Sequence, residues 1–150
     1  MASLVYNTAK KEIFDGTIDL TAADIKVMLI GTATPYTPDA DHDTVDQASG
    51  SELSATNYTG GFAGAGRKAF ASPAIAVDKT NDRAEFDATD LTWTSLGGAA
   101  NGTVEAAIII REVTNDAGSR LIAYIDLTNT TTDGSNFTIQ WDAEGILQLS

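Results

Sequence analysis

Apolar residues recur at every second position along much of the chain, which is the spacing of a half-buried β-strand. Over 25–31, Ile25, Val27 and Leu29 share one face and Gly31 ends the run. Similar runs cover 69–77, 83–87, 90–94, 104–113, 121–127, 137–142 and 146–149. About eight short strands with turn residues between them predict an antiparallel all-β fold, a β-sandwich of jelly-roll-like type.

The alternation also predicts which side chains form the core. The run over 104–113 is apolar at consecutive positions, so we expect a central strand covered on both faces. Ile109, Ile125, Ile139 and Trp141 are expected to point inward. The chain contains no internal repeat and no linker-like stretch, so residues 1–150 are expected to form a single domain.

Two segments depart from this pattern. Residues 1–20 are expected to form an arm with a short helix, capped by Asn7 and stopped at Gly16. Residues 31–66 are rich in Asp, Thr, Ser, Ala and Gly and show little periodicity, which predicts a long irregular loop. We expect both segments to be free in solution and to become ordered on a binding partner.

Charge and composition narrow the function. The 150 residues include 9 Lys and Arg against 21 Asp and Glu, for a net charge of −12, and there is no cysteine. This excludes disulfides and thiolate metal sites, and it argues against nucleic-acid binding, which needs clustered basic residues. No apolar run reaches the roughly 20 residues of a membrane span, and the first residues lack the features of a signal peptide. We expect a soluble protein that is made in the cytoplasm.

The sequence contains no constellation typical of catalysis. There is one histidine, and no spacing favours one carboxylate pair over another among the 21 acids. The glycine-rich stretch 60–68 lacks the Ser or Thr that follows the lysine of a nucleotide-binding loop, since Ala69 stands there. We therefore predict a protein that is not an enzyme and that uses no cofactor.

One acidic segment has the alternating carboxylates of a calcium loop: Asp39, Asp41 and Asp43. An EF-hand loop needs glycine at its sixth position and glutamate at its twelfth, where this chain has Thr44 and Gly50. We predict a solvated acidic loop without a structural metal ion. If an ion does bind the chain, these three aspartates are the candidate ligands.

Several segments, taken in order, resemble a family of small virion structural proteins of tailed bacteriophages. They are YNTAK (6–10), GTIDL (16–20), IKVML (25–29), YTPDADHD (36–43), YTGG (58–61), NDRA (81–84), LTW (91–93), LIAYID (121–126) and FTIQWD (137–142). The resemblance covers nearly the whole chain. It implies a β-protein of the virion without enzymatic activity.

The resemblance further implies a decoration or cement protein on the capsid exterior, bridging neighbouring major capsid proteins as a homo-oligomer, either a dimer or a trimer. Neither nucleic acid nor membrane is an expected partner. The candidate contact residues lie on the arm and the long loop or at its end: Tyr6, Lys10, Lys11, Tyr36, His42, Tyr58, Phe62 and Arg67. The alternative is a binding module of the tail or of a fibre that recognises a host receptor or carbohydrate.

Overall fold

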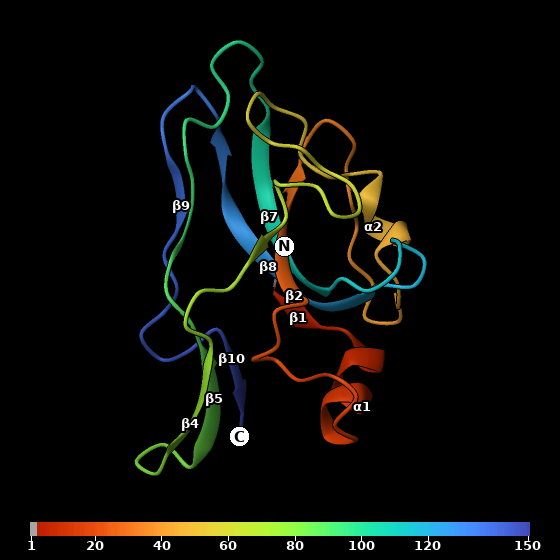
Figure 1. Cartoon of the computed structure of the whole chain (residues 1–150). Helices are drawn as coiled ribbons and strands as arrows, with labels where there is room; N and C mark the ends of the chain where they lie inside the picture. Colours follow the sequence, from red (N-terminus) through yellow and green to blue (C-terminus); the bar gives the residue numbers. More distant parts are fainter. Residues whose placement is uncertain (1–2) are drawn as a thin grey trace.

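The computed structural model describes residues 3–150, and its largest element is a five-stranded antiparallel sheet (Figure 1). Its strands, in spatial order, are β1 (Leu4–Val5), β8 (Arg120–Thr131), β7 (Thr103–Arg111), β2 (Ile25–Gly31) and β3 (Lys68–Ala69). In this register Ile109 of β7 lies between Val27 of β2 and Ala123 of β8. The predicted central strand is therefore confirmed.

Two smaller antiparallel sheets run alongside the large one, at the left of Figure 1. One has the order β10 (Leu147–Leu149), β5 (Arg83–Asp87) and β4 (Ala74–Asp78), and the other pairs β6 (Leu91–Trp93) with β9 (Phe137–Ile139). Strands account for 37% of the chain and helices for 8%. The predicted all-β, antiparallel, sandwich-like fold is confirmed.

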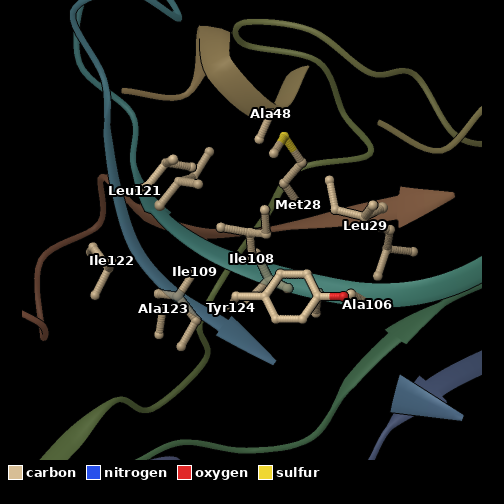
Figure 2. Packing of buried hydrophobic residues seen from close by; sticks show 14 of the residues in the cluster. Met28, Leu29, Ala48, Ala106, Ile108, Ile109, Leu121, Ile122, Ala123 and Tyr124 are labelled. Carbon is tan, nitrogen blue, oxygen red and sulfur yellow. The ribbon is translucent and has the colours of Figure 1, made fainter. Parts of the chain in front are cut away.

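The core centres on β2, β7 and β8. Figure 2 shows their buried side chains, with Met28 of β2 pointing toward Ala48 of the short helix α2 (Asp46–Ser49). Residues 106–110 of β7 are all fully buried, because this strand has a partner on each edge and a covered surface on each face. Such consecutive burial explains why the sequence here is apolar without alternation.

The core prediction is correct for Ile109 and Ile139 and wrong for the other two residues. Ile125 and Trp141 are only partly buried and pack at the margin of the core. Both line a cleft of about 510 Å³ between β8 and the segment that leads into β10. The cleft leaves these two side chains half-covered.

The N-terminal arm is docked on the sheet, which corrects the expectation of a free segment. β1 pairs with β8, with Leu4 opposite Tyr124 and Val5 opposite Ala123. The helix α1 (Asn7–Phe14) follows at once, and Tyr6 occupies its N-cap position in place of the expected Asn7. The helix ends before Gly16, whose φ of 76° is the left-handed conformation expected there.

The strand predicted over 69–77 is divided in two by Pro73. Pairing with β2 ends at Ala69, and β4 begins directly after Pro73, which has no backbone N–H to contribute to a ladder. The part before Pro73, β3, pairs with β2, while the part after it, β4, joins β5.

Neither helix found in residues 3–150 is long and apolar enough to cross a membrane.

Candidate functional site

Residues 31–66, predicted to be an irregular and mobile loop, are fixed along the edge of β2. The backbone N–H of Gly31 donates to the Ser51 carbonyl at 2.9 Å, and that of Leu53 donates to the Leu29 carbonyl at 2.9 Å. β3 covers β2 at Lys26 and Val27 alone, so the rest of this buried edge needs other hydrogen-bond partners. The loop supplies them in place of a strand.

Tyr58 completes this cover from inside the protein. Its hydroxyl accepts the Leu29 backbone N–H at 3.0 Å and donates to Glu52 Oε1 at 2.9 Å. Burial raises the pKa of the Tyr58 phenol well above its usual value, so the side chain stays protonated and able to donate.

Arg67 is the centre of a buried ionic cluster that holds the end of the loop. Its guanidinium lies 2.8 Å from Glu52 Oε2, 2.6 Å from Asp116 Oδ1 and 3.2 Å from Glu112 Oε1. The cluster also includes Lys26, whose ammonium pairs with Glu112. One guanidinium thus ties the loop to β7 and to the turn that joins β7 to β8.

Charge pairing within the cluster is reflected in its pKa values. Burial alone would raise the pKa of Glu112, but bonds from Lys26, the Ala63 backbone N–H and Arg67 outweigh it, so that pKa is lowered. Burial would lower the pKa of Arg67, and hydrogen bonds to Glu52 and Asp116 raise it instead. These groups therefore stay ionised near neutral pH and stabilise one another.

A second internal network joins the arm to the loop. The hydroxyls of Tyr6 and Tyr36 are 3.0 Å apart, and the Tyr36 hydroxyl lies 2.9 Å from His42 Nδ1. Burial, with a hydrogen bond to Tyr36, raises the pKa of Tyr6. The ring of Tyr36 also packs against that of Tyr124 on β8, with centroids 6.1 Å apart.

The two networks correct the prediction of partner contact for four of the eight candidate residues. Tyr6, Tyr36, Tyr58 and Arg67 lie inside the protein, where they hold the arm and the loop and offer no surface to a partner. His42 is half-buried beside Tyr36. The remaining three candidates are exposed at the surface: Lys10, Lys11 and Phe62.

The predicted acidic segment serves as a tether to the start of α1. Asp41 Oδ1 accepts from Asn7 Nδ2 at 2.8 Å, and Asp43 accepts from the Thr8 hydroxyl. Asp39 accepts from the Asp41 backbone N–H at 3.0 Å, as in a local turn. Whether this segment binds calcium stays a prediction, and we expect thermal melts in EDTA and in millimolar calcium to coincide.

Within residues 3–150, one group of acids brings three potential ligand atoms within 4.8 Å of one another: Asp78, Glu85 and Glu144. Arg83 already lies among them. Its Nε is 2.6 Å from Glu85, one of its terminal nitrogens is 3.4 Å from Asp78, and the same nitrogen pairs with Glu144. The guanidinium therefore supplies the positive charge that these acids need.

The most conspicuous surface feature is apolar. We use the name apolar groove for a hollow of about 330 Å³ between α1 and the β10–β5–β4 sheet, whose apolar lining includes Ile13, Phe14, Leu20, Ile75, Phe86, Leu147 and Leu149. Phe14 is 74% exposed and Leu149 is 56% exposed. Phe14 lines this hollow with most of its side chain open to solvent.

The apolar groove continues into the cleft beside β8, because both are lined by Val5, Leu147 and Gln148. Trp141 borders the cleft, and its buried indole Nε1 has no hydrogen-bond partner within the described part of the chain. Sequence reasoning missed this surface, because alternation shows that a strand has an apolar face but not whether anything covers it.

Comparison with protein-family models, with curated protein sequences and with solved structures finds no match to this chain.

Proposed function

We propose that this chain is a non-enzymatic structural protein of a tailed-bacteriophage virion, which decorates or cements the outer capsid by bridging neighbouring major capsid proteins. The observation that carries the proposal is the exposed apolar groove on a protein with a net charge of −12. The resemblance of the sequence segments supports a place in the virion and on the capsid, and the groove supports attachment through an apolar surface.

An exposed apolar groove on a protein of net charge −12 is typical of a protein–protein contact. Burying apolar surface is favourable by about 25 cal/mol per Å². The four most exposed large apolar side chains are Phe14, Ile75, Val77 and Leu149, on α1 or the β10–β5–β4 sheet. Their gathering in one region supports one docking surface better than scattered exposure would.

The walls of the groove are preorganised. On one side, α1 is fixed by the buried Tyr6 and by the hydrogen bond from Asn7 to Asp41. On the other, β5 is held between β4 and β10, and Arg83 pairs with Glu85 on β5 itself, with Asp78 of β4 and with Glu144 before β10. Binding at a rigid surface loses little conformational entropy, which favours affinity. This replaces the expectation that a disordered arm and loop become ordered on the capsid.

Net negative charge suits the exterior of a capsid better than its interior, where packaged DNA would repel it. On a repeating lattice, weak contacts also add through effective concentration, so a modest groove suffices if several copies are linked. A protein that joins adjacent capsid subunits in this way would stabilise the shell against heat and low salt.

The test is co-sedimentation with assembled shells, stripped of decoration, of the virus that encodes this chain. Wild-type protein should sediment with the shells, and the Phe14→Ser variant should lose most of that binding because Phe14 projects into the groove. Val113→Ser removes another exposed apolar side chain, outside the groove, and should bind like wild type.

Absence of binding by wild type would overturn the capsid proposal. Equal loss in both variants would overturn the role of the groove. If the protein is found instead on purified tails or fibres, in a few copies per particle, the alternative of a receptor- or carbohydrate-binding module holds.

A further inference from the structure

β4 is the longest of the strands that stand at the end of a sheet in residues 3–150. It has five residues and pairs with β5 on one side alone, whereas the other edge strands, β1, β3, β6, β9 and β10, have two or three residues each. An unpaired edge exposes backbone N–H and C=O groups that can pair with another strand. The length of β4 makes it the best template for such pairing.

The sequence of β4 lacks the charges that usually protect an edge. Ile75 is 58% exposed and Val77 is 72% exposed, and the alanines between and before them are also exposed. The one charged residue, Asp78, stands at the end of the strand and is bound by Arg83 at 3.4 Å and by Asn81 Nδ2 at 2.6 Å. Pro73 precedes the strand and removes no donor from it.

We propose that β4 pairs antiparallel with β4 of a second copy of this chain, about a two-fold axis that passes beside Ala76. Ala76 is the middle residue of the strand, so this register uses its full length. Ile75 then lies opposite the partner's Val77, and Ala74 lies opposite the partner's Asp78. The two three-stranded sheets become one sheet of six strands.

The charges and side chains of β4 suit this register. Asp78 meets an alanine of the partner, so no like charges stand opposite each other, although each copy carries a net charge of −12. Alanine meets alanine at the axis, which allows close approach of the backbones. The pairs of Ile75 with the partner's Val77 are β-branched on both sides, a favourable cross-strand combination.

The apolar rows of the two copies also become continuous. Within one copy Ile75, Phe86 and Leu147 lie in register across the sheet, as do Val77 and Ala84 with Leu149 beyond. Residues opposite each other in an antiparallel pair point to the same face, so both apolar grooves open on one side of the dimer. The pairing of the β4 strands does not depend on the proposed function. Bridging of two capsid proteins by the two grooves of a dimer rests on the proposed function.

Sedimentation velocity of the full chain tests the pairing. Wild type should sediment as a dimer that dissociates on dilution, and Ala76→Lys should be monomeric, because two lysines would face each other at the axis. The monomer should accept this lysine, since residue 76 lies opposite Glu85 of β5. Ala117→Lys, on the exposed turn between β7 and β8, makes the same charge change and should remain dimeric.

Cross-linking tests which residues of the two β4 strands lie opposite each other. The chain has no cysteine, so any disulfide must come from an introduced one. Directly opposed residues of antiparallel strands have Cα atoms about 4.5–5.5 Å apart, within the range that a disulfide spans. Under oxidised glutathione, Ala76→Cys should form a covalent dimer much faster than Ala117→Cys.

A wild-type monomer at every concentration would overturn the proposal, as would a dimer that Ala76→Lys leaves intact or equal cross-linking of the two cysteine variants. These outcomes are separate from shell binding. If the protein is a monomer and sediments with shells, the β4 pairing is contradicted and the capsid proposal is not. If it is a dimer and does not sediment with shells, the capsid proposal is contradicted and the pairing is not.

Discussion

At the scale of single residues, the chain buries charged side chains inside the protein, where removing them from water costs free energy. The Arg67 side chain is fully buried, and Glu112 beside it is nearly so. Such a cluster is stabilising only while its members are all present, because each ion compensates the desolvation of another. Because the cluster lies between the end of the loop 31–66 and the β7–β8 turn, it holds this loop, which lacks regular strands, in place.

Replacing Arg67 with leucine should therefore destabilise the fold strongly. The change leaves Glu52, Glu112 and Asp116 without their common partner, and breaking a buried ion pair costs about 3–5 kcal/mol. Urea unfolding measures this free energy. Lys11→Met is the control, because it removes an exposed lysine paired with Asp15, and its midpoint should hardly move. Equal midpoints for the two variants would contradict the role of the cluster.

The lowered pKa of Glu112 predicts acid sensitivity. The unfolded chain binds a proton at this carboxyl at a higher pH than the folded chain does, so the stabilisation is present above the ordinary glutamate pKa of about 4.3 and is lost as pH falls through the lowered value. The melting temperature of wild type should fall across this window more steeply than that of Glu112→Gln. Parallel curves for the two proteins would contradict the assignment.

At the scale of elements, the strands were predictable and the connection between them was not. The alternation predicts strands over 25–31 and 83–87, and these are the bounds of β2 and β5 in the structure. The prediction succeeds because a strand with one buried face has apolar residues at every second position. The order in 31–66 comes instead from a few long-range bonds, such as that between Leu29 and Tyr58, which leave no periodic signal. The apolar groove was hidden for a similar reason, since its walls come from segments far apart in the sequence.

Removal of the Tyr58 hydroxyl tests whether the loop depends on that bond. Tyr58→Phe keeps the ring but leaves the buried Leu29 N–H without its acceptor, which should cost about 1–3 kcal/mol. Hydrogen exchange should show faster exchange of the Leu29 amide and of the loop. Tyr124→Phe, also a buried tyrosine, changes no bond to β2 and is the control. Unchanged Leu29 exchange in Tyr58→Phe would contradict the account.

Two isoleucines on the central strands test the corrected limits of the core. Ile109 is fully buried, so Ile109→Ala should cost about 2–5 kcal/mol through lost packing. Ile125 is partly buried beside the open cleft, so Ile125→Ala should cost distinctly less. Denaturant unfolding of both variants decides this, and an equal loss would mean that Ile125 is as well covered as Ile109.

At the scale of the whole molecule, the arm and the loop are held on the sheets of an acidic protein, and an apolar groove lies open between α1 and the β10–β5–β4 sheet. The arm and the loop, which the sequence suggested as flexible contacts, are structural parts. We propose that contact is made by the apolar groove, which α1 of the arm forms with the β10–β5–β4 sheet, and that the outer strand of this sheet offers an edge to a second copy. Attachment through a fixed groove suits the proposed role of reinforcing a lattice, because a flexible link would transmit little restraint between its neighbours.

A cryo-EM map of the virion tests the proposal that this chain coats the outer capsid through its apolar groove. We predict density for this fold on the capsid exterior, repeating with the lattice, with Phe14 and Leu149 buried against the major capsid protein. Density in the tail or a fibre, or density on the capsid with the groove facing solvent, would contradict the account.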